Sequence, residues 1–134
     1  MTNNTIALDT NVLIYLHDNS SSKRAIANDL LAANPRISSQ VISEYLNTTR
    51  RLLNLSKEEL LIQTSALFAG CTIMPVLPYT LLFASELIKQ YKFQLFDAVI
   101  VASAIEGHCD ILYSEDMHNG LVVDKSLTII NPFI

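Results

Sequence analysis

Short apolar runs alternate with longer amphipathic segments along this chain. The short runs have the length of buried strands, and we expect strands at 5–8, 36–39, 71–76, 110–113 and 127–130. In the longer segments apolar residues recur at helical spacing, which predicts helices at about 10–16, 21–33, 40–53, 57–69, 79–92 and 98–106. Strands that alternate with helices predict an α/β fold with a mostly parallel central sheet.

Local signals mark several ends of these elements. Ser56 and the glutamate three residues later form a capping box at the start of a helix. Pro75 lacks the N–H that a central strand needs, so the strand at 71–76 is expected at an edge of the sheet. The segment 98–106 is apolar on nearly all sides, which is typical of a buried helix, and Asp97 is expected to open it.

The composition fits a single domain spanning residues 1–134. Half of the residues are hydrophobic and only 16% are charged, so the apolar surplus is expected in a sheet covered on both faces or against a protein partner. No apolar run could span a bilayer, and the first residues lack the basic region of a signal peptide. We therefore expect a cytoplasmic protein, with Cys71 and Cys109 as buried, reduced thiols.

Four carboxylates stand in apolar surroundings, near strand ends or on helices: Asp9, Glu44, Asp97 and Asp116. An unpaired charge in such a place is costly to desolvate. The chain has 13 acidic and 9 basic residues, so without these four acids the two signs would balance. Ligands of open α/β sheets collect beyond the carboxyl ends of the strands, where we expect the four acids to meet.

Each of the four acids also has a simpler explanation. Asp9 and Asp97 could be N-caps, Glu44 a solvated glutamate, and Asp116 the acceptor of an Asx-turn. As a set, however, they are the hard oxygen ligands that Mg²⁺ or Mn²⁺ prefers, and such a site can hydrolyse phosphodiesters. The histidines are scattered and expected at the surface, so zinc is not indicated, and no basic stripe typical of a duplex binder is visible.

Four segments resemble, in order and spacing, the acidic motifs of PIN-domain nucleases. They read IALDTNVLIYL at 6–16, SEYL at 43–46, FDAVIVASA at 96–104 and ILYSEDM at 111–117. The closing Asn-Pro-Phe at 131–133 also agrees with the family. Each motif alone is a weak sign of the family, but four in the right order are a strong one. The resemblance covers essentially the whole chain.

The resemblance implies a three-layer α/β/α sandwich and a Mg²⁺- or Mn²⁺-dependent endoribonuclease. Its catalytic and metal-binding residues would be Asp9, Glu44, Asp97 and Asp116. Asn11 and Ser114 would be polar supports that orient these acids. Glu115 is a rival for the fourth position, and we prefer Asp116 because its offset from Ser114 fits the family pattern.

For a small single-domain chain, the resemblance further implies the toxin of a VapBC-type toxin–antitoxin pair. The implied partners are an RNA substrate, a cognate antitoxin that covers the apolar surplus, and a second copy in a homodimer that supplies basic groups. Candidate RNA contacts are Lys23 with Arg24 and Arg50 with Arg51, although a solvated helix face is the simpler explanation of both pairs.

Two other functions fit parts of the pattern. A PIN-like module could grip a partner or RNA without cutting it. An aspartyl-phosphate protein also carries an Asp after its first strand, but a phosphatase of that kind has a second Asp where this chain has Asn11. A receiver domain needs a lysine after a late strand, and the stretch after Tyr113 has none.

Overall fold

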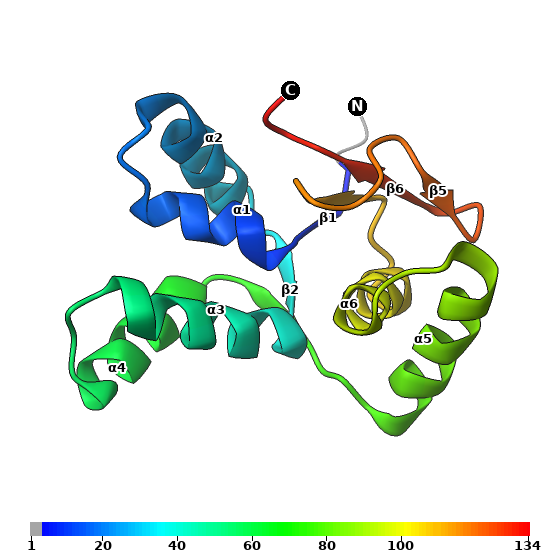
Figure 1. Cartoon of the computed structure of the whole chain (residues 1–134), viewed down its shortest axis with the longest axis horizontal. Helices are drawn as coiled ribbons and strands as arrows, with labels where there is room; N and C mark the ends of the chain where they lie inside the picture. The colour runs from blue at the N-terminus through cyan, green and yellow to red at the C-terminus, as the bar shows by residue number, and fades with distance from the viewer. Residues whose placement is uncertain (1–3) are drawn as a thin grey trace.

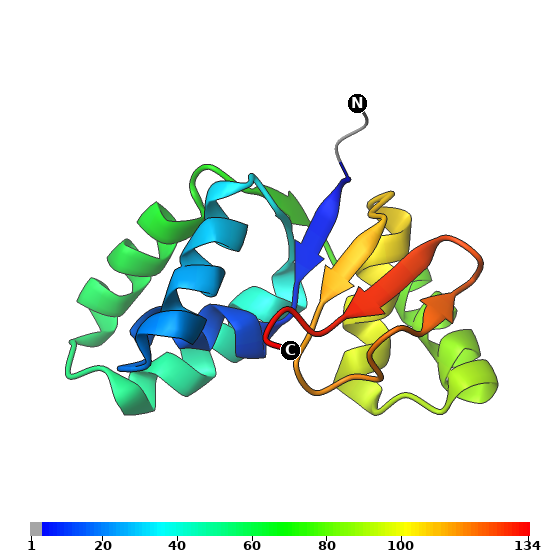
Figure 2. The same ribbon diagram turned by 90° about the horizontal axis from the view of Figure 1, so that it is seen from above.

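The computed structural model describes residues 4–134, which fold around one six-stranded sheet. In chain order the strands are β1 (Ile6–Leu8), β2 (Arg36–Ser38), β3 (Thr72–Met74), β4 (Ile111–Tyr113), β5 (Val122–Val123) and β6 (Leu127–Ile130). Across the sheet the order is β3-β2-β1-β4-β6-β5, and only β5 and β6 pair in antiparallel fashion. Figure 2 shows β1, β4 and β6 pointing the same way. The predicted mostly parallel sheet is confirmed.

Helices flank this sheet in the predicted α/β/α arrangement. They are α1 (Thr10–Ile14), α2 (Ser21–Ala32), α3 (Ser39–Leu52), α4 (Lys57–Phe68), α5 (Pro78–Tyr91) and α6 (Leu95–Glu106), with a 3-10 turn η1 (Tyr15–His17) after α1. In Figure 1 they group in three pairs around the sheet, α1 with α2, α3 with α4 and α5 with α6. Within residues 4–134, no helix has the length and apolar character needed to cross a membrane.

The central position of β1 determines where the ends of the strands meet. β1 lies between β2 and β4, and its register pairs Ala7 with Arg36 on one side and with Leu112 on the other. All three residues of β1 are buried, as is Leu112. Parallel strands covered on both faces read as continuous apolar runs, which explains why the sequence predicted them well.

The sequence predicted one edge strand of the sheet and not the other. β3 lies at one edge, as the proline after it indicated. β5, at the other edge, was not predicted, because it has only two residues and Val122 is 51% exposed. The apolar run that contains it, Leu121-Val122-Val123, has only three residues and is too short to identify a strand from the sequence.

Helix α6 begins earlier than the sequence predicts. Its N-cap is Gln94, and Asp97 lies within its first turn, so the prediction that Asp97 opens the helix is wrong. The first two residues, Leu95 and Phe96, are exposed, whereas the buried pattern that identified the helix starts only at Ala98. By contrast, Ser56 caps α4 as predicted, with its side chain accepting a hydrogen bond from the Glu59 N–H.

Polar contacts fix α6 against β2. The Ser38 hydroxyl at the end of β2 donates to that of Ser103 on α6 over 3.1 Å, and Arg36 at the start of β2 donates to the Gly107 carbonyl. The helix therefore runs opposite to the strand. Asp97, nearly two turns before Ser103, lies beyond the carboxyl end of β2.

Among the cysteines and histidines, His17 connects η1 to α3, because its Nε2 lies in hydrogen-bond contact with the Tyr45 hydroxyl at 2.6 Å. Both thiols are free; Cys109 is buried and Cys71 only partly so, which confirms the prediction fully for Cys109 alone. Burial raises the pKa of Cys109 to about 11, so the thiol is neutral at physiological pH. All three histidines are exposed, as predicted.

We predict that Leu112→Ala lowers the free energy of unfolding by about 2–5 kcal/mol, because Leu112 is fully buried in β4 and its truncation leaves a cavity. Leu82→Ala is the matched control, since Leu82 on α5 is 71% exposed and should change stability by no more than about 0.5 kcal/mol. Urea unfolding of both variants measures the difference. Equal losses would mean that β4 is not the core strand of the sheet.

Candidate functional site

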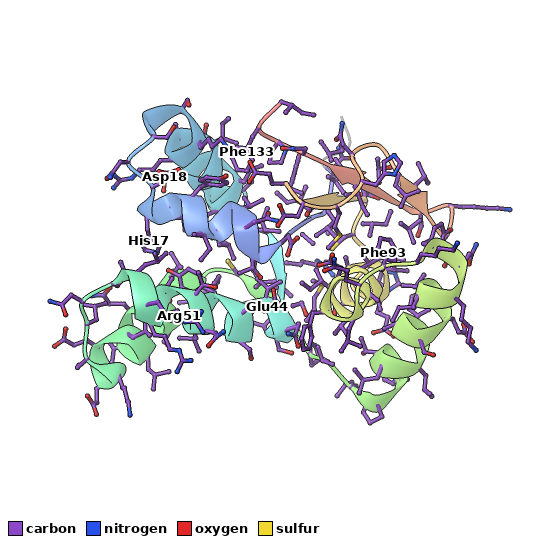
Figure 3. All side chains as sticks on the ribbon, in the orientation of Figure 1. His17, Asp18, Glu44, Arg51, Phe93 and Phe133 are labelled. Carbon is purple, nitrogen blue, oxygen red and sulfur yellow. The ribbon has the colours of Figure 1, made fainter. Side chains whose placement is uncertain are left out.

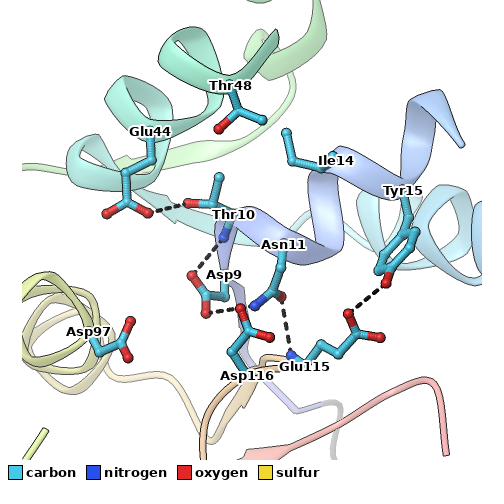
Figure 4. Close-up of a pocket in the computed structure, with 10 residues that line it drawn as sticks. All are labelled: Asp9, Thr10, Asn11, Ile14, Tyr15, Glu44, Thr48, Asp97, Glu115 and Asp116. Carbon is cyan, nitrogen blue, oxygen red and sulfur yellow. Dashed lines mark hydrogen bonds between the residues drawn. The ribbon is translucent and has the colours of Figure 1, made fainter. Parts of the chain in front are cut away.

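The four predicted acids line one pocket of about 390 Å³ at the carboxyl edge of the sheet. Figure 4 shows their side chains around this space. Asp9 follows β1, Asp116 lies just after β4, Glu44 is in the second turn of α3, and Asp97 is in the first turn of α6. Elements far apart in the sequence thus bring the four acids to the same place, as the sequence predicted.

Asp9 is the most deeply buried and most firmly held of these acids. It is only 4% exposed. Its carboxylate accepts hydrogen bonds from the Ser114 hydroxyl at 2.7 Å, the Thr10 N–H at 2.7 Å and the Asn11 amide at 3.3 Å. Its own N–H donates to the Tyr113 carbonyl of β4. Asp9 is therefore the N-cap of α1 that the simpler explanation supposed, but it also joins β1 to the loop after β4.

Burial also changes the acidity of Asp9. Desolvation, together with the charges of Asp97 and Glu44, raises the pKa of Asp9 to about 6, against the lowering effect of the hydrogen bonds from Ser114 and Thr10. A carboxylate of this kind is stabilised by any cation that enters the pocket, because the cation compensates both the lost solvation and the repulsion.

Glu44 is oriented by its neighbours and is not a freely solvated glutamate. One carboxylate oxygen accepts a hydrogen bond from the Thr10 hydroxyl at 2.8 Å, and the other accepts one from the Gln40 amide at 3.1 Å. Thr10 thus connects two acids, because its N–H holds Asp9 and its hydroxyl holds Glu44. The contact fixes the start of α1 against α3.

Asp97 and Asp116 form the less constrained side of the pocket. Within residues 4–134, no hydrogen bond holds either carboxylate. Desolvation raises the pKa of Asp97, and the charges of Glu44 and Asp116 add to this effect. Asp116 is exposed. These two acids keep their oxygen lone pairs for a ligand in the pocket.

Glu115 faces away from Asp97 although it is next to Asp116 in the sequence. The Tyr15 hydroxyl donates to its carboxylate at 2.6 Å, and the Lys23 ammonium pairs with it at 3.1 Å. Its N–H donates to the Asn11 side chain at 3.1 Å. The hydrogen bond from Tyr15 and the contacts with Lys23 lower the pKa of Glu115. The structure therefore places Asp116, and not Glu115, beside Asp97 (Figure 4).

Two residues of this neighbourhood were not predicted from the sequence: Thr10 and Tyr15. Tyr15 could have been found, because it follows Asn11 at the four-residue spacing that puts two side chains on one helix face. Lys23 was a candidate RNA contact, with a solvated helix face as the simpler explanation; in the structure it pairs with Glu115 and its ammonium lies 4.6 Å from the centre of the Tyr15 ring. Arg50 lines a different hollow, between α3 and α4.

The pocket suits a partly hydrated hard cation. Within residues 4–134, no three carboxylate, imidazole or thiol side chains converge closely enough to enclose a metal ion. Mg²⁺, however, commonly binds through one or two carboxylates and keeps several waters. The polar groups that line the pocket offer oxygen and one amide nitrogen, with no thiolate or imidazole, which favours Mg²⁺ or Mn²⁺ over zinc.

Comparisons with known proteins agree with this architecture. The family model of the PIN domain matches residues 6–118. No curated protein matches the sequence.

Several solved structures share the fold. A toxin–antitoxin complex from Klebsiella pneumoniae contains a chain that is 21% identical, with 96% of this chain and 97% of that chain covered and a TM-score of 0.70. VapC20 from Mycobacterium tuberculosis, a toxin that cleaves the sarcin–ricin loop, is 18% identical over 84% of this chain and 90% of its own, with a TM-score of 0.67. FitAcB from Neisseria gonorrhoeae is 17% identical over 96% and 99%, with a TM-score of 0.66.

We predict that Asp97→Asn raises the melting temperature of the metal-free protein at pH 7.5. In the wild type the pKa of Asp97 is raised on folding, so its charge opposes folding above that pKa, and the penalty disappears as the pH falls and the group is protonated. The advantage of the variant should therefore shrink toward pH 4. Thermal unfolding in EDTA across this pH range measures it, with Asp29→Asn on the exposed surface of α2 as the control. A constant difference at all pH values would contradict the repulsion.

Proposed function

The chain belongs to the PIN-domain family, and we propose that it is a Mg²⁺- or Mn²⁺-dependent endoribonuclease that acts as the toxin of a toxin–antitoxin pair in the cytoplasm. The observation that carries the proposal is the convergence of Asp9, Glu44, Asp97 and Asp116 on one pocket. Nothing in the fold requires four carboxylates at one edge of the sheet, and their mutual repulsion is costly without a cation.

In this proposal the four acids divide the work of holding the metal. Asp9 provides a fixed ligand, because three hydrogen bonds determine its orientation. Asp97 and Asp116 provide adjustable ligands on the open side, and Glu44 faces the same pocket from α3. When bound, Mg²⁺ or Mn²⁺ supplies Lewis-acid stabilisation of a phosphodiester and lowers the pKa of water.

The neighbouring polar residues would act as supports and not as ligands. Ser114 and Asn11 donate to Asp9, which leaves the remaining lone pairs of its carboxylate directed into the pocket. Thr10 holds Glu44 in the same way. Because Ser114 and Thr10 are short, buried side chains and Asn11 is half-buried, these supports would keep the carboxylates in place.

The proposed protein partners are an antitoxin and a second copy of the chain. One of the similar structures is itself a toxin–antitoxin complex. Large apolar side chains are exposed on this chain, including Leu61 and Ile62 on α4 and Leu82 on α5, and a protein partner would bury them. A small DNA-binding protein encoded next to this chain, which co-purifies with it, would support the antitoxin assignment.

A non-catalytic PIN-like module is the main alternative. It is favoured by the absence, within residues 4–134, of three side chains close enough to enclose a cation. An aspartyl-phosphate mechanism is disfavoured, because Asp9 is 4% exposed and its carboxylate is held by three donors. Calorimetric titration with Mn²⁺ separates a metalloenzyme from a module that binds no metal.

We predict that the wild-type protein cleaves single-stranded or structured RNA in Mg²⁺ or Mn²⁺ and that Asp97→Asn cleaves it at least about 100-fold more slowly, since a lost metal ligand removes several kcal/mol of transition-state stabilisation. Asp29→Asn makes the same chemical change on an exposed surface and should cleave normally. Unchanged cleavage by Asp97→Asn would refute the proposal. RNA cleavage in EDTA would refute the requirement for metal.

A further inference from the structure

A second hollow of about 470 Å³ lies directly beside the acid pocket. It is formed by residues 90–94, which are the end of α5 and the connection to α6, and by the loop that follows β4. Asp97 and Asp116 line both hollows. The two hollows are therefore adjacent, and a linear polymer that contacts these two acids can extend from one into the other.

The two hollows carry different charges. The acid pocket is lined by five carboxylates and by no lysine, arginine or histidine. The second hollow adds Lys92 and His118 to its lining and no carboxylate beyond the two that it shares. Lys23, the base nearest to the acid pocket from the other side, is paired with Glu115. Positive charge for a phosphate next to the acids thus comes from the second hollow.

Aromatic and amide side chains give this hollow a surface suited to a nucleobase. The rings of Tyr91 and Phe93 lie 5.8 Å apart, and both residues are only partly buried. The Tyr91 hydroxyl accepts a hydrogen bond from the Asp124 N–H at 3.0 Å, which holds this ring in place. Figure 3 shows Phe93 beside α6, which carries Asp97. The amides of Gln90 and Gln94 also line the hollow.

The backbone at Lys92 is one that glycine also adopts, as it is at several other residues of the chain. Lys92 is the C-cap of α5 and has φ 60° and ψ 36°, the left-handed conformation. Glycine adopts this conformation without the steric cost that a side chain adds. Lys92 is exposed and lines the hollow, and a glycine at this position would keep the backbone conformation while removing the charge.

We propose that the second hollow binds the nucleotide of a single-stranded RNA that adjoins the phosphodiester at the acid pocket. Lys92 binds a backbone phosphate, and Phe93 stacks on a base. The inference rests on the proposed nuclease function for its substrate class, but the binding itself does not depend on cleavage. Stacking on aromatic rings combined with a nearby cation is a general way to hold single-stranded nucleic acid.

The test measures the affinity of a short fluorescent single-stranded RNA with Ca²⁺ in place of Mg²⁺, so that it is not cut. Lys92→Gly should weaken binding about threefold to tenfold at low salt and reduce the salt dependence by about one phosphate contact. Its melting temperature should not fall, because glycine suits the backbone there. Phe93→Leu, which keeps an apolar side chain, should weaken binding about fivefold or more through lost stacking.

Lys89→Ala is the matched control, because it removes the same charge about one turn earlier on α5, outside the lining of the hollow. It should retain wild-type affinity. Wild-type affinity in both Lys92→Gly and Phe93→Leu would overturn the inference, and so would an equal loss in Lys89→Ala. If the wild type binds this RNA but does not cleave RNA in Mn²⁺, the nuclease proposal fails while the two variants still decide the inference. No binding by the wild type overturns both.

Discussion

The carboxylate of Asp9 is buried at the carboxyl end of the central strand, and the surrounding structure is arranged to satisfy it. Its hydrogen-bond donors come from the first residues of α1 and from the loop after β4, so one side chain joins the two halves of the parallel sheet. Because a buried carboxylate is tolerated only with such donors, the position of Ser114 and the start of α1 are fixed together. The neighbouring acids are then placed relative to this fixed group.

The pocket combines a rigid side with an adjustable one. Asp9 and Glu44 are held through Thr10, which binds both, whereas Asp97 and Asp116 have no such partners within residues 4–134. Glu115 is kept apart by Tyr15 and Lys23, so a fifth carboxylate does not compete for the same cation. This division is useful in a site where a ligand must be held firmly and still be released, since preorganised groups bind without reordering and mobile ones accommodate change.

The sequence predicted the sheet and the gathering of the four acids, because buried parallel strands leave continuous apolar runs and strand ends share one edge. Through the family resemblance it also indicated Asn11 and Ser114 as supports of the acids, but it did not predict the contacts that orient Glu44 and Glu115. Thr10 reaches Glu44 across 34 positions and Tyr15 reaches Glu115 across 100, and such pairs depend on how helices pack. The start of α6 was misplaced because Leu95 and Phe96 are exposed apolar residues, which carry no amphipathic signal. β5 was missed because two residues are too few to form a pattern.

The hydrogen bond between Asp9 and Ser114 joins residues far apart in the sequence, and this separation determines when the pocket can form during translation. Asp9 is made near the beginning of synthesis, but its donor Ser114 is made 105 positions later, and Asp116 follows it. Strand β1, which precedes Asp9, can pair with β4 only after β4 has been synthesised. A nascent chain therefore has no assembled pocket until the segment that carries Ser114 and Asp116 has emerged from the ribosome.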